Sequence, residues 1–291
     1  MCSLLAEAGK CRVRRNLSRF VCSLRLRRAV ASWGIFRPRV KKEVGKMLTD
    51  EQKRFFAEMG FVVVPSIIPP YRLEAMRRRI EELCERWESE EARRVGAQQE
   101  AEAGNPIAVR TAATVRKFSG LTRYEPLFRE QAMDKTLVDI VAELIGTPLL
   151  LYDDQAMLKP PFVGSAKLPH QDNAYFHIEP ADACVTCWMA LDDATVENGC
   201  LHYLAGSHRW GLLPHHAIAG TPHLVPDLPD DLEWTPAPAN AGDVVIHHSL
   251  TVHFSPDNRS PFWRRSFICH YVRADARMPH KDPTQLLRVR D

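Results

Sequence analysis

Two histidine-containing segments, far apart along the chain, constrain its fold more than any other feature. The first is His170-Gln171-Asp172, in which residues i and i+2 of a strand or its frayed end point to the same side. The second is the apolar, β-branched run 243–255, which contains His253 and predicts a strand pair or a strand with a bend. If these side chains converge, strands from both segments must meet. The short strands and loops predicted after residue 146 suit a barrel with helices packed outside.

The residue types in these segments indicate a metal site. Two imidazoles and one carboxylate on one face of a metal leave the opposite face open, which is the arrangement of non-haem Fe(II) oxygenases. A bare His-x-Asp pattern is weak evidence, and the chain contains a second one, His280-Lys281-Asp282. Prolines bracket that second pattern and disfavour a regular strand, and no later histidine completes the set. We therefore expect the metal at His170, Asp172 and His253.

Roughly residues 47 to 273 resemble the phytanoyl-CoA dioxygenase family. The matching motifs are Leu48-Thr-Asp-Glu-Gln-Lys, Gly60-Phe-Val-Val-Val-Pro, Leu168-Pro-His-Gln-Asp-Asn-Ala-Tyr-Phe, Trp188-Met-Ala-Leu-Asp-Asp, Glu197-Asn-Gly-Cys-Leu, Gly206-Ser-His-Arg-Trp-Gly, Gly242-Asp-Val-Val-Ile-His-His, and Asn258-Arg-Ser with Arg264-Arg265-Ser266. The resemblance implies a mainly β fold with flanking helices, the double-stranded β-helix or cupin-like jelly roll. It also implies that the protein uses Fe(II), 2-oxoglutarate as cosubstrate, and O2.

Carried over to this sequence, the resemblance assigns the iron ligands to His170, Asp172 and His253. It assigns Arg264 to the distal carboxylate of 2-oxoglutarate, and a guanidinium suits that task because it offers two parallel donors and stays charged. The neighbouring Arg265 should face the other way if both residues lie on one strand.

Four further positions match the cosubstrate contacts of the family more loosely: Lys117, Gln155, Trp188 and Ser255. Trp188 could instead be a core residue, Ser255 a turn residue before a proline, and Lys117 a solvated charge. These alternatives stay open at the level of sequence.

The activity implied is hydroxylation of a small molecule with release of succinate and CO2. A carboxylate at Asp172 favours hydroxylation, because relatives that halogenate have a small residue there. One alternative is a metal-dependent isomerase or lyase on the same fold, against which Arg264 speaks. The other is a binding protein that has lost turnover, which no missing residue supports. The sequence specifies neither the substrate nor the oligomeric state.

Charge divides the chain before Met47. Residues 1–46 contain 13 of the 39 Lys and Arg residues but only two of the 36 acidic residues, which leaves residues 47–291 with a net charge of −8. We interpret 1–46 as a disordered or artefactual extension, with organellar targeting or nucleic-acid contact as alternatives. We interpret 47–291 as the oxygenase domain, and its acidic balance argues against nucleic-acid binding.

No apolar run approaches the roughly 20 residues of a membrane helix. Cys184-Val-Thr-Cys187 is a lone CxxC pattern without the second pair that a zinc site needs. It lies in an apolar run, so we expect reduced cysteines in a buried strand. Reduced cysteines agree with a reducing compartment, and we expect a cytoplasmic protein.

The remaining pattern predicts the outer elements. Thr49 and Gln52 form a capping box before a short helix, and strands are expected at 61–64 and 149–159. Helices are expected from 70 to about 94 and from about 127 to 145, the second ended by Gly146. Two segments, 98–105 and the proline-rich 208–240, are expected to be irregular loops, and the longer one suits a lid.

Overall fold

The computed structural model describes residues 47–105 and 109–291. The predicted extension 1–46 lies outside the described residues, so the division at Met47 stays a prediction. The first described residues are tied to the domain, because the backbone amides of Met47 and Leu48 donate to the carboxylate of Glu143.

The α-helices of the described chain are α2 (Asp50–Met59), α3 (Pro70–Glu85), α4 (Glu90–Arg94), α5 (Leu121–Tyr124), α6 (Pro126–Ala132), α7 (Lys135–Ile145) and α8 (Asn173–Phe176). The short 3-10 helices are η2 (Glu100–Ala103), η3 (Ala112–Thr114), η4 (Ala181–Ala183), η5 (Ser207–Trp210) and η6 (Pro283–Gln285).

The strands are β1 (Phe61–Val64), β2 (Gln98–Gln99), β3 (Val115–Ser119), β4 (Leu149–Lys159), β5 (Lys167–His170), β6 (Cys184–Ala190), β7 (Leu201–Tyr203), β8 (His215–Ala217), β9 (Leu224–Pro226), β10 (Thr235–Ala237), β11 (Val244–His248), β12 (His253–Ser255), β13 (Arg264–Arg273) and β14 (Leu287–Arg290).

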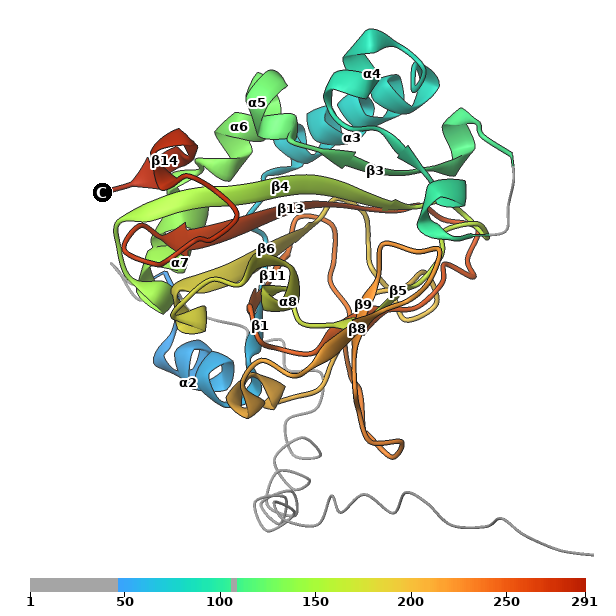
Figure 1. The fold of residues 1–291 in the computed structure, drawn as a ribbon. Coiled ribbons are helices and arrows are strands. Elements are labelled where there is room, and N and C mark those ends of the chain that lie inside the picture. Colours follow the sequence, from blue (N-terminus) through green and yellow to red (C-terminus); the bar gives the residue numbers. More distant parts are fainter. Residues whose placement is uncertain (1–46, 106–108) are drawn as a thin grey trace, which may run out of the picture. The chain divides into compact units, whose positions relative to one another are not determined.

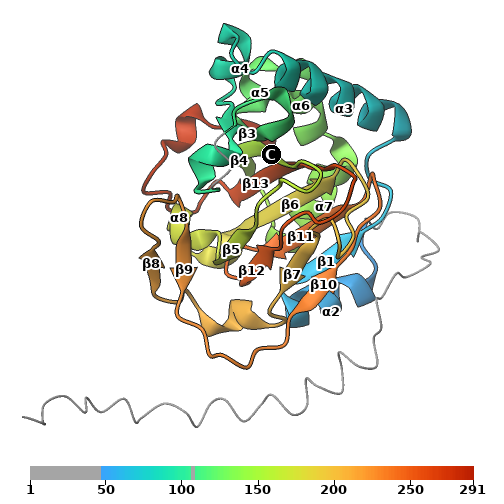
Figure 2. The ribbon, with the colours of Figure 1, turned by 90° about the vertical axis from the view of Figure 1, so that its right-hand side faces the viewer.

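Two antiparallel sheets form the body of the domain. The large sheet has the order β1-β11-β6-β13-β4-β3-β2, with β14 also paired to β4, and the small sheet has the order β10-β7-β12-β5. Figures 1 and 2 show the small sheet on one side of the large sheet and helices α3, α5, α6 and α7 on the other. The predicted double-stranded β-helix with flanking helices is therefore confirmed.

The main core lies between the large sheet and the helices. Buried apolar side chains of α3, such as Met76 and Ile80, join those of α7 and of the central strands in one cluster. The hydroxyl of Tyr271 on β13 also donates to the carbonyl of Ala132 on α6 at 2.7 Å. No described helix has both the length and the apolar character needed to cross a membrane.

Side chains of the central strands alternate between this core and the opposite face, as the period of two requires. On β6, Val185, Cys187 and Met189 join the core cluster, whereas Thr186 and Trp188 line a cavity between the sheets. One face of β6 therefore packs in the core, and the other face forms part of the cavity wall.

The two cysteines of the CxxC pattern are free thiols in a fully buried strand, so the prediction of reduced core cysteines is confirmed. The cytoplasmic location stays a prediction.

Both long helices predicted from the sequence are interrupted, so those two predictions were wrong in extent. The first ends at Glu85, and a new helix starts where the Ser89 hydroxyl accepts the amide of Ala92. The second breaks at Asp134, whose carboxylate accepts the amides of Thr136 and Leu137 and starts α7. A capping side chain offers the backbone an alternative to continuing the previous helix. The capping box at Thr49 and the end of α7 at Gly146 are confirmed.

The two segments expected to be irregular are partly regular. Residues 98–105 form β2 and η2, and Glu100 is fully buried in an ion pair with Arg116 at 3.0 Å. Residues 208–240 contain β8 and β9, which pair with each other, and β10, which joins the small sheet. β9 lies beside β5, the edge strand of the small sheet. The role of this segment as a lid stays a prediction.

We expect Asp134→Ala to lower the free energy of unfolding by about 1–2 kcal/mol, since it removes the N-cap of α7 and the 3.0 Å contact with Arg72. Chemical denaturation measures the change. Lys135→Ala is the control, because that side chain is 88% exposed and its loss should cost well under 1 kcal/mol. Equal stabilities for the two variants would contradict the capping role.

Candidate metal centre

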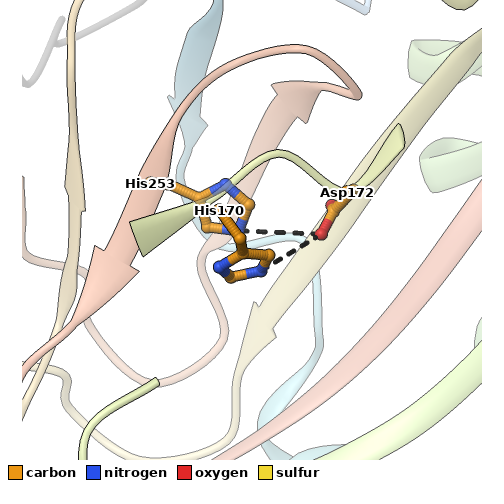
Figure 3. A group of neighbouring side chains, drawn as sticks. All are labelled: His170, Asp172 and His253. Atoms are coloured by element: carbon orange, nitrogen blue, oxygen red, sulfur yellow. Dashed lines mark ion pairs between the residues drawn. The ribbon is translucent and has the colours of Figure 1, made fainter. Parts of the chain in front are cut away.

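His170, Asp172 and His253 converge on one point (Figure 3). His170 is the last residue of β5, His253 is the first of β12, and the two are direct partners in the antiparallel pairing of these strands. Asp172 leaves the strand and takes a helical conformation as the N-cap of α8. Its Oδ1 lies 3.4 Å from Nε2 of His170 and 3.8 Å from Nε2 of His253. All three side chains are buried.

The hydrogen bonds of His170 and His253 determine which ring nitrogen of each histidine is free to bind a metal. Nδ1 of His170 donates to the carbonyl of Leu168 at 2.8 Å, and Nδ1 of His253 donates to the carbonyl of Thr251 at 2.9 Å, because a carbonyl can only accept. Each neutral imidazole therefore presents the lone pair of Nε2. Burial lowers the pKa of both imidazoles, which favours this neutral form.

The third group of the cluster is an anion. Burial opposes ionisation of Asp172, but the hydrogen bond that His247 donates favours the carboxylate, and the carboxyl pKa lies well below its ordinary value. The cluster thus consists of two lone pairs and a carboxylate oxygen within 4.8 Å of one another. A buried group of acceptors without donors fits a metal cation, and nitrogen and oxygen ligands of this kind suit Fe(II).

A network from the large sheet holds the second oxygen of Asp172. Oδ2 accepts hydrogen bonds from the Thr186 hydroxyl at 2.5 Å and from Nε2 of His247 at 3.0 Å. Since His247 carries its proton on Nε2, its Nδ1 accepts from Tyr203 at 2.8 Å, and His270 donates to Thr186 at 2.8 Å. Oδ1 is left for the metal. Such outer contacts orient a ligand and tune its basicity.

These supporting residues were not predicted from the sequence. A signal was present, because His247 and Thr186 are polar residues within apolar runs that form fully buried parts of β11 and β6. A buried polar side chain needs a partner, but the strand pattern alone does not show which one.

All eight residues predicted for the site line one cavity of about 410 Å³ between the two sheets, namely His170, Asp172, His253, Arg264, Lys117, Gln155, Trp188 and Ser255. The structure therefore brings together every sequence-predicted site residue. Lys117 lies on β3, Gln155 on β4 and Ser255 on β12. Trp188 is 3% exposed, and because it lines the cavity it belongs to the site wall as well as to the buried interior. Their contacts with a cosubstrate stay predictions.

Arg264 is a buried cation without a counterion among the residues that the structure describes. It is 2% exposed, its Nη1 donates to the Ser266 hydroxyl at 3.2 Å, and its Nε has no hydrogen-bond partner among the described residues. Its guanidinium lies 5.4 Å from the centre of the Trp188 ring. Burial lowers its pKa to about 9. A buried unpaired charge is costly, so this residue fits an anion that enters the cavity.

The next residue, Arg265, points to the opposite face, as predicted from the strand period. Its guanidinium donates to both carboxylate oxygens of Asp192, at 2.8 and 2.9 Å, and to Glu81. Arg265 is therefore a paired structural residue, and only Arg264 is available to a ligand.

Comparison with known proteins places the chain among oxygenases. The phytanoyl-CoA dioxygenase family model matches residues 56–266. The chain is 28% identical to a probable phytanoyl-CoA dioxygenase of Caenorhabditis elegans over 248 residues, covering 79% of this chain and 77% of that protein. It is 26% identical to the peroxisomal phytanoyl-CoA dioxygenase of Homo sapiens, covering 79% and 70% of the two chains.

Two solved structures show the same architecture. The non-heme alpha-ketoglutarate-dependent carbocyclase SnoK from nogalamycin biosynthesis is 26% identical, with a TM-score of 0.61 over 79% of this chain and 86% of that chain. EctD from S. alaskensis with bound Fe is 18% identical, with a TM-score of 0.63 and coverage of 84% of each chain. The second likeness supports the fold alone.

We expect Co(II), a redox-stable probe of the metal site, to raise the melting temperature of the metal-free protein. At a Co(II) concentration about 100-fold above the Kd, the free energy of unfolding should rise by roughly 2.7 kcal/mol, and the melting temperature rises with it. His253→Ala should abolish this gain without unfolding the protein, whereas His280→Ala, in the exposed second His-x-Asp pattern, should retain it. A full shift in the His253 variant, measured by differential scanning fluorimetry, would refute the site.

Proposed function

Because this chain belongs to the phytanoyl-CoA dioxygenase family and is a 2-oxoglutarate-dependent dioxygenase that uses Fe(II) and O2, we propose that it hydroxylates a small molecule and releases succinate and CO2. The observation that carries the proposal is that one cavity contains both a cluster of metal-ligating acceptors and a buried, unpaired cation. His170, Asp172 and His253 need a cation, and Arg264 needs an anion. A metal and a 2-oxo diacid together meet both demands.

Each residue has a defined task in this proposal. His170, His253 and Oδ1 of Asp172 would hold Fe(II), and the guanidinium of Arg264 would bind the distal carboxylate of 2-oxoglutarate. When bound, the metal and cosubstrate supply the oxidising chemistry, while the protein supplies binding and orientation. The Trp188 ring packs at the guanidinium and so limits its rotamers.

Lys117, Gln155 and Ser255 are proposed as further cosubstrate contacts from their place on the cavity wall. The Lys117 ammonium has no ion pair at 4.0 Å or less among the described residues, and burial lowers its pKa, so a carboxylate beside it would relieve an uncompensated charge.

Several apolar side chains on the same wall exclude water from the reacting end of the cavity, among them Met157, Leu201, Phe254 and Ile268. Exclusion of water strengthens the charged contacts inside and prevents side reactions. The carboxylate of Asp172 occupies the position at which a halogenating relative would need space, and this supports hydroxylation.

The test is turnover of the full chain with Fe(II), 2-oxoglutarate and O2 across a metabolite panel, with succinate and the product mass measured together. Hydroxylation gives substrate-dependent succinate and a product that has gained one oxygen atom. An isomerase or lyase would act without consuming 2-oxoglutarate. A binding protein would retain metabolites without producing succinate, and either result would overturn the proposal.

We expect Arg264→Lys to raise the KM for 2-oxoglutarate roughly ten- to hundredfold, because lysine loses the two-donor fork and a charged hydrogen bond contributes about 1.5–3 kcal/mol. The KM for the small-molecule substrate should change far less. Arg265→Lys is the matched control on the opposite face of β13, and its KM for 2-oxoglutarate should stay near that of the parent. If neither variant alters this KM in succinate assays, the cosubstrate assignment is wrong.

A further inference from the structure

A second group of unmet hydrogen-bonding atoms lies in the same cavity, beside the metal centre. It consists of Lys167 on β5, Tyr175 on α8 and His223 between β8 and β9. The Lys167 ammonium lies 3.1 Å from the Tyr175 hydroxyl and 3.4 Å from Nδ1 of His223. The Tyr175 ring also meets the ring of His170 edge to face at 5.9 Å. The group therefore adjoins a residue of the metal centre.

The hydrogen bonds within this group leave only donors facing the cavity. An ammonium can only donate, so both Tyr175 and Nδ1 of His223 accept from Lys167. The Tyr175 hydroxyl also accepts a hydrogen bond from the amide of Leu224 at 2.9 Å, and its own proton has no acceptor within the described part of the chain. Burial, reinforced by Lys167, lowers the pKa of His223 to about 4, so the ring is neutral with its proton on Nε2. One ammonium proton, the hydroxyl proton and the imidazole N–H are therefore left without an acceptor among the residues that the structure describes.

Two other charged residues on the cavity wall, Arg116 and Asp153, already have partners. Arg116 pairs with the buried Glu100 at 3.0 Å, and Asp153 pairs with Lys281 at 3.1 Å. No carboxylate lies within 4.0 Å of the Lys167 ammonium in the part of the chain that the structure describes. Burial lowers the pKa of Lys167 to about 8, so much of it stays protonated near neutral pH. This cation is uncompensated.

The cosubstrate does not account for Lys167. In the function proposed above, Arg264 and Lys117 match the two carboxylates of 2-oxoglutarate, and Asp172 offsets part of the metal charge. Lys167 is the remaining cation of the lining, with a hydroxyl and an imidazole arranged around it. A cluster of three donors without an acceptor fits an oxyanion.

We propose that Lys167, Tyr175 and His223 bind an anionic group of the small-molecule substrate, either a carboxylate or a phosphate. The rest of that substrate would contact the apolar lining, which includes Phe176, Phe254 and Ile268. The substrate is then an amphipathic acid. This inference rests on the proposed function, because it treats Arg264 and Lys117 as occupied by 2-oxoglutarate.

The test measures binding to the full chain loaded with Fe(II) and 2-oxoglutarate without oxygen, by calorimetry. The probes are hexanoate, hexyl phosphate and hexanol, which share one apolar chain and differ in the head group. We expect one or both anions to bind at least tenfold more tightly than hexanol, and their order distinguishes carboxylate from phosphate. Lys167→Met should lower the affinity for the preferred anion roughly ten- to hundredfold. Tyr175→Phe should lower this affinity by a smaller factor.

Lys135→Met is the matched control, because it removes a lysine charge at an exposed position of α7 and should leave probe binding unchanged. Binding of 2-oxoglutarate is followed separately through the visible charge-transfer absorption of its Fe(II) chelate. If 2-oxoglutarate binds but the parent does not prefer either anion to hexanol, the anion site is refuted and the proposed function stands. If the parent does not bind 2-oxoglutarate at all, the proposed function itself fails.

Two further outcomes would overturn the inference. A loss of 2-oxoglutarate binding in Lys167→Met would assign Lys167 to the cosubstrate site. A marked fall in melting temperature would show a structural partner for this lysine. We expect instead an equal or higher melting temperature without ligand, because the variant removes an uncompensated buried charge that is kept for binding at the cost of stability.

Discussion

The carboxylate of Asp172 links the large sheet to the small sheet at the metal centre, which takes residues from both. Its Oδ2 is held by Thr186 and His247 from the large sheet, and its Oδ1 faces His170 and His253 from the small sheet. A buried carboxylate is tolerated only with such donors around it. The direction in which Asp172 presents its free oxygen to the two histidines depends on this arrangement.

Several polar atoms on the cavity wall have no hydrogen-bond partner within the described part of the protein. At the metal centre the unpaired atoms are acceptors, whereas the unpaired atoms of Arg264 and of the Lys167 group are donors. Each of these groups costs folding free energy in the empty protein, because buried polar atoms need partners. Their complements must come from ligands, so the function of the site can be inferred from the sign of each unmet group.

Features that depend on local periodicity could be predicted from the sequence. The metal ligands, the opposite orientations of Arg264 and Arg265, and the buried β6 all follow from motif spacing and the period of two. The role of His247 and the proposed role of Lys167 could not be predicted, because they arise from contacts between segments distant in sequence. The two long helices were overextended for a different reason: apolar periodicity continues through Ser89 and Asp134, where a single capping side chain restarts the helix.

The direct pairing of His170 with His253 in the small sheet has a consequence for folding. β5 has four residues, and β7, β10 and β12 have three each, so this sheet has few backbone hydrogen bonds to hold its register. A one-residue slip would turn either imidazole to the wrong face. A metal ion held by both histidines would act as a cross-link that closes the loop from 170 to 253. Such a cross-link reduces the conformational entropy of the unfolded chain. The metal would then also hold the short strands of the small sheet together, and its loss would open that sheet before the helix-covered core.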